Sequence, residues 1–323
     1  MKAIEVTAFG DADVIEVTET DVPEPRAGQV RIEVKAAGIN FADIMQRRGH
    51  YDGGPTPPYN PGMEVAGVID AVGEGVNRDV GEEVVSLVTS GGYAEYALAD
   101  ARGLLDIPGE MGFEEAAGFP VQWLTAHNCL HEWGELEADE TVLIHAAAGG
   151  VGSAAVQLAS EAGAEVIGTA STQEKLDLAA ELGLDHGIQY TEEDFVERVN
   201  EITDGSGVEL VLDSIGGETT RESQDCLASW GRMVSFGAAA GTPGRPDTGV
   251  LLFANQRVIG YHLGRALETK PMKVMSAVPE LTQLLGDGTL EVQVGHTFDL
   301  EDAAEAHRFI EDRKSSGKVV LTP

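Results

Sequence analysis

Cysteine, basic residues and long apolar runs are all scarce in this chain of 323 residues. Two cysteines, Cys129 and Cys226, are too few for a disulfide framework or a four-cysteine zinc site. No apolar run approaches the roughly 20 residues that a membrane-spanning helix needs. The first residues alternate as in a strand and form no apolar secretory segment. We therefore expect a cytoplasmic protein from a reducing compartment, with no membrane partner.

The shortage of basic residues leaves a strongly negative chain. There are 55 acidic residues against 21 basic ones, a formal net charge of −34, and the acids are scattered along the sequence. A dispersed negative surface repels nucleic acid, which excludes that class of partner. Salt relieves the self-repulsion, because the Debye length falls to about 3 Å at 1 M. We interpret the composition as halophilic; an ordinary acidic enzyme is the alternative.

Two kinds of pattern divide the chain. Residues 1–122 combine short alternating strands such as 30–34 with frequent glycine and proline turns, which predicts a small β-rich domain. Residues 123–262 alternate apolar strands with helical patterns and predict a doubly wound parallel sheet of the α/β class. The predicted strands are 141–145, 164–169, 186–189, 208–212, 232–236 and 256–261, and the predicted helices are 150–162, 172–182, 192–203 and 217–229.

The tail, residues 263–323, returns to mixed structure. A helix is predicted from Pro271 to about Leu285, because proline suits the first position of a helix. A strand near 292–298, a helix near 301–313 and a closing strand at 318–321 follow. We expect this tail to complete the first domain, so that 1–122 plus 263–323 form one domain and 123–262 is inserted within it.

The stretch 139–160 carries the strongest functional signal. A short apolar strand ends in a loop of small residues, and an amphipathic helical pattern follows. This order places a pyrophosphate at a helix N-terminus. In the G-x-G-x-x-G pattern, Ala147 takes the first place and two glycines take the others. The expected contacts are Ala148, Gly149, Gly150 and Val151; a glycine-rich connection without a ligand is the alternative.

The residues after the second strand of this domain select the cofactor. Enzymes that use NAD usually carry an acid about 20 residues after the glycine loop, and the corresponding position here is Ala170. Ser171 can donate to a phosphate, and Lys175 adds a cation, which favours NADPH. The alternative is that Ser171 and Glu174 form a helix capping box and that Lys175 is simply solvated.

The glycine loop and its flanks resemble the zinc-independent quinone oxidoreductases, related to zeta-crystallin, of the medium-chain dehydrogenase/reductase superfamily. The segments that carry the resemblance are 139–160, 37–43, 61–67, 213–216 and 317–321. The resemblance implies a GroES-like catalytic domain, an inserted Rossmann domain that binds NADPH, a cleft between the two and a homodimer.

The zinc ligands of the wider superfamily are missing. Zinc members place a cysteine where Asn40 stands and a histidine where Met63 stands. An amide and a thioether cannot replace these ligands in a catalytic zinc site, so we expect no metal. His127 and His131 with Cys129 are the one other grouping, and we interpret them as ordinary helix residues.

Without a metal, the substrate oxygen must be polarised by hydrogen bonds. The resemblance places Asn40 beside the nicotinamide and the substrate, where its amide can donate to a developing oxyanion. It places Tyr51 in the same cleft; in the related enoyl-thioester reductases a tyrosine here is the proton donor. A turn residue and a packing residue are the structural alternatives for Asn40 and Tyr51.

The resemblance also implies further cofactor contacts. Thr125 would reach the nicotinamide side and Tyr190 the adenosine phosphate. Lys318 would reach the cofactor from the closing strand, unless it is a surface lysine. The remaining contacts would come from strand ends and from a residue closing over the ring, namely Ser214, Phe236, Gly237 and Phe253.

These observations predict an NADPH-dependent, metal-independent reductase that transfers hydride to quinones or α,β-unsaturated carbonyls. An enoyl-thioester reductase is the nearest alternative, although it would call for a cationic entrance that so acidic a chain does not visibly offer. A non-catalytic NADPH-binding protein is the alternative of another class.

Overall fold

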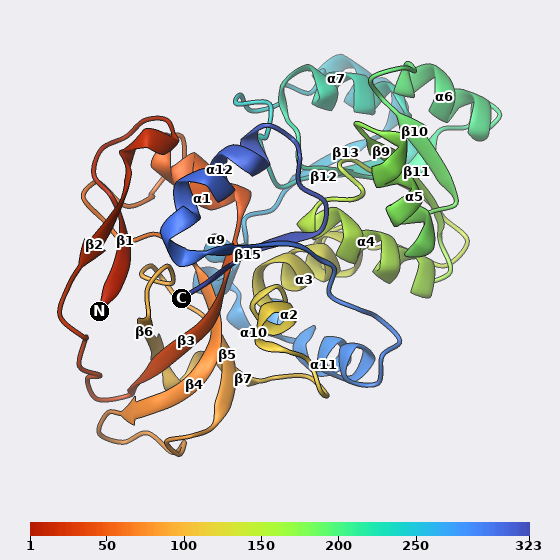
Figure 1. The fold of residues 1–323 in the computed structure, drawn as a ribbon. Helices are drawn as coiled ribbons and strands as arrows, with labels where there is room; N and C mark the ends of the chain where they lie inside the picture. Colours follow the sequence, from red (N-terminus) through yellow and green to blue (C-terminus); the bar gives the residue numbers. More distant parts are fainter. The chain divides into compact units, whose positions relative to one another are not determined.

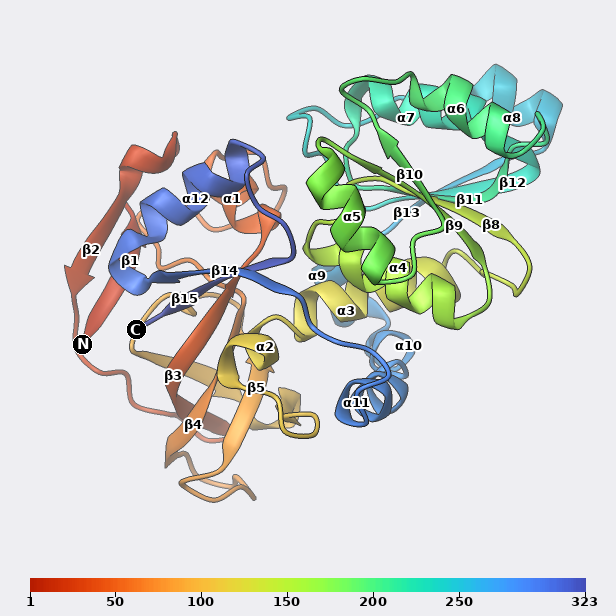
Figure 2. The ribbon, with the colours of Figure 1, turned by 45° about the vertical axis from the view of Figure 1, so that its right-hand side comes forward.

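The computed structural model describes all residues from Met1 to Pro323. Residue contacts divide the chain into two units, one formed by Met1–Val121 with Thr282–Pro323 and the other by Gln122–Leu281 (Figures 1 and 2). The second unit includes residues 263–281, which the sequence analysis assigned to the first domain. None of the helices has the length and apolarity that crossing a membrane requires.

The first unit is built on a mostly antiparallel seven-stranded sheet in the order β14-β15-β3-β4-β5-β7, with β6 also paired to β3. Its strands are β3 (Gln29–Ile39), β4 (Glu64–Val72), β5 (Glu83–Leu87), β6 (Tyr96–Asp100), β7 (Leu104–Asp106), β14 (Val294–Asp299) and β15 (Lys318–Thr322). A separate two-stranded ribbon joins β1 (Lys2–Val6) to β2 (Ile15–Glu19).

Alternation along β3 builds the core of this unit. Val30, Ile32 and Val34 are buried while the polar residues between them are partly exposed, as a period of two requires. Two helices, α1 (Phe41–Arg47) and α12 (Ala303–Glu311), lie side by side (Figures 1 and 2), and Arg47 of α1 forms an ion pair with Glu311 of α12. The short helix α2 (Phe113–Ala117) completes the unit.

The second unit contains the predicted six-stranded parallel sheet, in the order β10-β9-β8-β11-β12-β13. Its strands are β8 (Thr141–Ile144), β9 (Glu165–Ala170), β10 (His186–Gln189), β11 (Val208–Asp213), β12 (Leu227–Ser235) and β13 (Arg257–Gly260). One face carries α4 (Gly150–Glu161) and α5 (Gln173–Glu181). The other face carries α6 (Phe195–Ile202), α7 (Gly217–Asp225) and α8 (Thr248–Ala254), as Figure 2 shows. The predicted α/β fold class is confirmed.

Helix α3 (Pro120–His127) precedes this sheet and continues as a π-helical turn over Asn128–Glu132. Helices α9 (Leu263–Thr269) and α10 (Pro271–Met275) follow it, and α11 (Val278–Gly286) crosses the boundary between the two units. The single helix predicted from Pro271 to Leu285 is therefore wrong, because the chain breaks at residues 276–277. Pro279 explains the break, since in one continuous helix it would have no N–H group for the carbonyl of Met275 and its ring would clash with that carbonyl.

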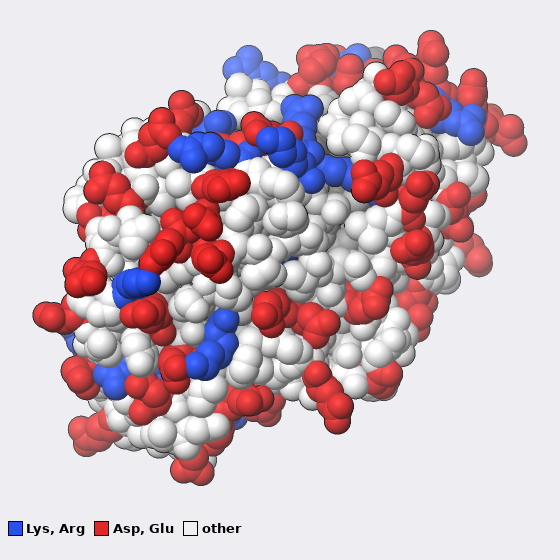
Figure 3. Space-filling model, in the orientation of Figure 1, with Lys and Arg blue, Asp and Glu red and all other residues white.

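Acidic side chains far outnumber basic ones on the molecular surface. Figure 3 shows acidic side chains scattered over the whole visible face, with basic side chains far fewer. This distribution agrees with the dispersed negative charge that the sequence indicates.

Candidate functional site

The order of the parallel strands reverses between β8 and β11, and ligands of doubly wound folds bind beyond the carboxyl ends of the strands at such a point. The predicted glycine loop follows β8 directly. Gly149 is the N-cap of α4, which begins at Gly150. Because the first N–H groups of a helix lack intrahelical acceptors, this turn suits the pyrophosphate of a dinucleotide.

The small residues of the loop are needed for a close approach between helix and strand. A methyl group on Gly152 would lie 2.9 Å from the carbonyl carbon of Ala147 and closer still to the Ala146 carbonyl oxygen. Ala146 itself has a φ of 53°, a left-handed conformation that is uncommon outside glycine. Gly152 therefore has the packing role that the pattern assigns to its third glycine.

The end of β11 lies beside that of β8, which leads into this loop, and the end of β12 lies beside that of β11. Ser214 and the pair Phe236 and Gly237 are neighbours, because a methyl group on Gly237 would lie 2.5 Å from the Ser214 carbonyl oxygen. The buried carboxylate of Asp213 holds the turn by accepting from the N–H groups of Ile215 (2.9 Å) and Gly216 (3.0 Å). The predicted cofactor contacts Ser214, Phe236 and Gly237 thus lie together at the carboxyl ends of β11 and β12.

The residues predicted to select NADPH lie at the ends of β9 and β10. The Tyr190 N–H donates to the carbonyl of Ala170, the last residue of β9, at 3.2 Å. The N-cap of α5 is Thr172, whose hydroxyl accepts from the Lys175 N–H. The alternative of a Ser171–Glu174 capping box is therefore wrong. Ser171 and Tyr190 thus lie at neighbouring strand ends, and Lys175 lies in the first turn of α5.

Two other predicted contacts have different surroundings. Thr125 is buried within α3 with 7% of its surface exposed. Phe253 lies on α8 with 88% exposed, so it packs over nothing within its own unit. Its expected position over a nicotinamide ring stays a prediction.

In the first unit, Asn40 lies in a buried polar cluster. Its Nδ2 donates to Glu64 Oε1 at 2.8 Å, and its Oδ1 accepts from Lys318 Nζ at 2.9 Å. Lys318 also forms an ion pair with Glu64 Oε1, and Glu64 Oε2 accepts from the Val121 N–H at 2.8 Å. Lys318 is 2% exposed, so the alternative of a surface lysine is wrong.

Asp43 and Tyr93 extend this cluster. Asp43 Oδ2 accepts from the Asn40 N–H at 2.8 Å and from the Tyr93 hydroxyl at 3.0 Å. Its other oxygen, Oδ1, is buried without a hydrogen-bond partner. Burial raises the pKa of Asp43 to about 6, although both hydrogen bonds lower it. Burial and the nearby Asp43 carboxylate raise the pKa of Tyr93 well above its usual value.

Tyr51 follows α1 in the loop after Arg48 and is partly buried. Burial, with a smaller contribution from the Asp43 charge, raises the pKa of its phenol. A phenol with a raised pKa remains protonated at neutral pH and can donate a proton or a hydrogen bond.

Sequence reasoning did not assign roles to Asp43, Glu64 or Tyr93. A signal was present, since Asp43 follows Asn40 by one helical turn and Glu64 directly precedes the apolar run 65–69. It also missed His145, which precedes the glycine loop and is hydrogen-bonded to Thr169 (3.0 Å) and Ser223 (2.7 Å). Burial lowers the pKa of His145 to about 4, against the opposing effect of Asp213.

No group of three or more histidine, cysteine, aspartate or glutamate side chains in the structure is arranged to hold a metal ion. The rings of His127 and His131 pack at an angle of 59° with centroids 4.8 Å apart, and His127 pairs with Glu280 at 3.2 Å. Cys129 is fully buried, and burial raises the pKa of its thiol well above the usual value.

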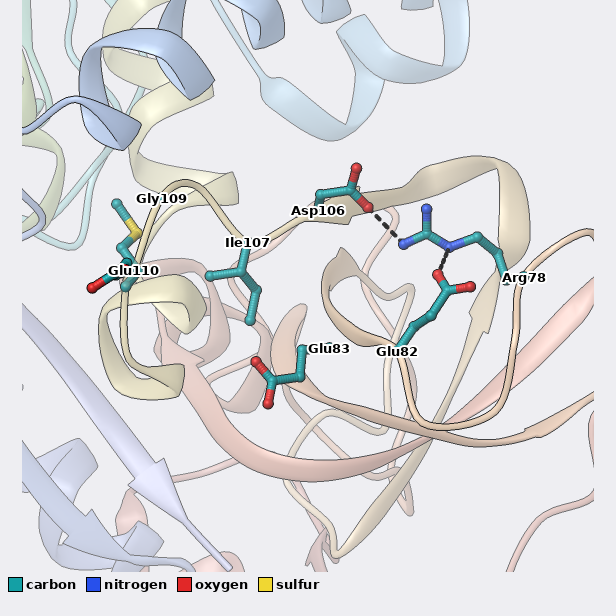
Figure 4. A pocket seen from close by; sticks show the side chains of 8 residues that line it. Arg78, Glu82, Glu83, Asp106, Ile107, Gly109 and Glu110 are labelled. Atoms are coloured by element: carbon teal, nitrogen blue, oxygen red, sulfur yellow. Dashed lines mark hydrogen bonds and ion pairs between the residues drawn. The ribbon is translucent and has the colours of Figure 1, made fainter.

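A pocket of about 450 Å³ lies elsewhere on the first unit (Figure 4). Arg78 points toward Glu82 and Asp106 and pairs with each at 2.7 Å. The lining includes none of the predicted site residues: it consists of Arg78, Glu82, Glu83, Asp106, Ile107, Gly109, Glu110 and Met111.

Comparisons with known proteins cover most of the chain. Residues 26–109 match the family described as alcohol dehydrogenase GroES-like domain, and residues 150–280 match the family described as zinc-binding dehydrogenase. The first match confirms the GroES-like prediction for the β-rich unit.

Among curated proteins, the chain is 38% identical to a quinone oxidoreductase of Salmonella typhimurium, over 99% of each sequence. It is 36% identical to the synaptic vesicle membrane protein VAT-1 homolog of Rattus norvegicus, over 100% of this chain and 84% of that protein. Among solved structures, Escherichia coli quinone oxidoreductase complexed with NADPH superposes with a TM-score of 0.94 at 35% identity, over 100% of both chains.

Proposed function

Because the chain belongs to the quinone oxidoreductases of the medium-chain dehydrogenase/reductase superfamily, we propose that it is an NADPH-dependent reductase of quinones or α,β-unsaturated carbonyls that needs no metal. The observation that carries this proposal is the buried polar cluster that orients the Asn40 amide where a zinc enzyme would carry a cysteine ligand. When bound, NADPH supplies the hydride.

Asn40 stabilises the negative charge that develops on the substrate oxygen. Its amide nitrogen has two N–H bonds, and Glu64 uses one of them. The other is available to an oxyanion. A conjugated acceptor spreads the added charge over several atoms, so hydrogen bonding can replace the stronger polarisation by a metal ion. Tyr51 remains protonated and supplies a proton to the reduced product.

The cofactor contacts divide between the two ends of the dinucleotide. Ala148, Gly149, Gly150 and Val151 hold the pyrophosphate. Ser214, Phe236, Gly237 and Thr125 lie toward the nicotinamide, and Phe253 closes over the ring. Ser171, Lys175 and Tyr190 bind the 2′-phosphate of the adenosine half, where a cation and hydroxyl donors complement a dianionic group.

The preference for NADPH is tested by Lys175→Ala. The variant loses a cation next to the 2′-phosphate, so we expect the Kd for NADPH to rise about tenfold or more while the Kd for NADH stays nearly unchanged. Fluorescence titration in molar KCl measures both constants. Lys314→Ala, which removes an exposed lysine paired with Asp312, is the control. An equal loss for both cofactors, or wild-type protein that binds both equally, would contradict the assignment.

The chain is also proposed to form a homodimer. Strand β13 is an edge of the parallel sheet, and exposed sheet edges tend to pair with another chain. Helix α8, which precedes β13, exposes Leu252 (71%) and Phe253 (88%), and Trp230 of the neighbouring strand β12 is 72% exposed. An apolar surface next to an open edge suits two-fold pairing with a second copy.

A further inference from the structure

Three neighbouring strands converge on the Asn40 side chain. In the antiparallel pairing of β15 with β3, Val319 lies opposite Ile39, which brings Lys318 level with Asn40 just beyond the strand end. In the pairing of β3 with β4, Ala37 lies opposite Val65, which brings Glu64 to the same end. The sheet register therefore places one cation and one carboxylate on either side of a single amide.

The chemistry of these two neighbours determines which way the amide faces. An ammonium group can only donate hydrogen bonds, and a carboxylate can only accept them. The atom of Asn40 that meets Lys318 must therefore be the oxygen, and the atom that meets Glu64 must be the nitrogen, as the distances of 2.9 and 2.8 Å describe. With Lys318 on its oxygen and Glu64 on one N–H, Asn40 keeps its second N–H group to donate to a further partner.

The fold makes room for this arrangement at two glycines. A methyl group on Gly38 would lie 2.6 Å from Lys318 Cε and 2.7 Å from Glu64 Oε1. A methyl group on Gly118 would lie 3.2 Å from Lys318 Cγ. The lysine side chain is thus enclosed along its length, and its Nζ reaches Asn40 and Glu64.

Glu64 is not placed to act as a base. One of its oxygens accepts from both Asn40 and Lys318, and the other accepts from the Val121 N–H. Both oxygens of this 0% exposed carboxylate are therefore engaged. Its role is to fix the positions of Asn40 and Lys318 by accepting hydrogen bonds from both.

We propose that Lys318 and Glu64 are positioning residues that fix the Asn40 amide as a dedicated hydrogen-bond donor, so that the site takes substrates presenting an acceptor oxygen such as a quinone or enone carbonyl. The proposal rests on the proposed function, in which Asn40 faces the substrate. It gives Lys318 a role through Asn40 and not through contact with the cofactor.

The test is a double-mutant cycle between Lys318→Met and Asn40→Ala, read in kcat, KM and the Kd for NADPH. Lys318→Met keeps the enclosed side chain and removes the charge. We expect about a 10- to 100-fold loss in kcat with the Kd for NADPH unchanged, because a misplaced donor stabilises the transition state poorly. In the Asn40→Ala background the same substitution should have little further effect, since residues that act through one group are not additive.

The matched control is Arg31→Met. Arg31 on β3 forms an ion pair with Asp70 on β4 at 2.8 Å. This pair also joins two strands of the same sheet, but it lies away from Asn40. The kcat of Arg31→Met should equal that of the wild type. Independent, additive effects of Lys318→Met and Asn40→Ala would overturn the proposal, as would a raised Kd for NADPH at unchanged kcat.

The orientation of the amide can be tested without turnover. A neutron structure should show deuterium on the Asn40 atom facing Glu64 and none on the atom facing Lys318. The reverse would overturn the proposal even if Lys318→Met fails to fold. If Asn40→Ala turns over like the wild type while the neutron structure shows the expected orientation, the proposed function of Asn40 fails and the positioning of its amide stands.

Discussion

At the residue scale, the first unit concentrates buried charge around one amide. Glu64, Lys318 and Asp43 are all at most 2% exposed, although charged side chains are rarely buried without partners. Lys318 and Glu64 neutralise each other, whereas Asp43 has one unpartnered oxygen. Burial raises the pKa of Asp43 to about 6, and its unpartnered oxygen can carry the proton.

A pH dependence follows from the raised pKa of Asp43. The folded-state value of about 6 exceeds the usual value of about 3.9, so the folded state keeps a proton that the unfolded chain has lost. The free energy of unfolding should therefore fall by up to about 3 kcal/mol as the pH rises from 4 to 6. Asp43→Asn should remove this fall. Urea unfolding of both proteins at several pH values measures it, and parallel curves would contradict the assignment.

The sequence identified Asn40 and Lys318 as separate site residues but could not pair them. They are 278 positions apart, and their contact depends on the pairing of β15 with β3. Long-range register of this kind is determined by the whole sheet and leaves no local pattern in the sequence. The alternative of a helix cap at Ser171 is wrong for a local reason, because the adjacent Thr172 is also a suitable cap and takes that place.

At the element scale, the alternation of strands and helices was sufficient to predict the parallel sheet and its six strands. The spacing of apolar residues and the glycine-rich loop after β8 are local features of the sequence, and local features are enough to predict individual strands and helices. The tail was predicted less well, because the single helix from Pro271 ignored Pro279, which suits the first turn of a helix and not its interior. The structure therefore has two helices, α10 and α11, where the sequence predicted one.

The edge of the parallel sheet supplies the next prediction. If β13 and α8 form the proposed dimer contact, Phe253→Ser removes a large apolar side chain from it and should raise the dimer dissociation constant about tenfold. Sedimentation velocity over a range of concentrations measures the constant. Met272→Ser is the matched control, because Met272 is 85% exposed on α10 in the same unit. An unchanged dissociation constant would contradict the dimer contact, and any loss of turnover in the same variant reports separately on the proposed contact of Phe253 with the cofactor.

At the scale of the whole molecule, negative charge dominates. A net charge of −34 on 323 residues opposes the compact state through self-repulsion, and salt screens that repulsion. The ion pairs near the surface, such as Lys2 with Glu301, relieve only part of it. Stability should therefore depend on ionic strength over the whole protein.

The salt dependence gives a direct prediction. We expect the midpoint of thermal unfolding to rise steadily between 0.1 and about 2 M KCl, because the Debye length shortens from about 10 Å to less than 3 Å. Circular dichroism measures the midpoint. Choline chloride at equal ionic strength should act similarly if screening is the cause. A midpoint that falls or stays constant would contradict the halophilic interpretation of the composition.

The central claim is that Asn40 serves a metal-independent reduction by NADPH. The most direct measurement is NADPH oxidation by chelator-treated protein in molar KCl, with a panel of quinones, enones and enoyl-CoA thioesters, for the wild type and for Asn40→Ala. We predict turnover of quinones or enones by the wild type and about a 100-fold lower kcat in Asn40→Ala, with the Kd for NADPH nearly unchanged. Binding of NADPH without oxidation by any acceptor, turnover restricted to enoyl-CoA, or full activity in Asn40→Ala would contradict it.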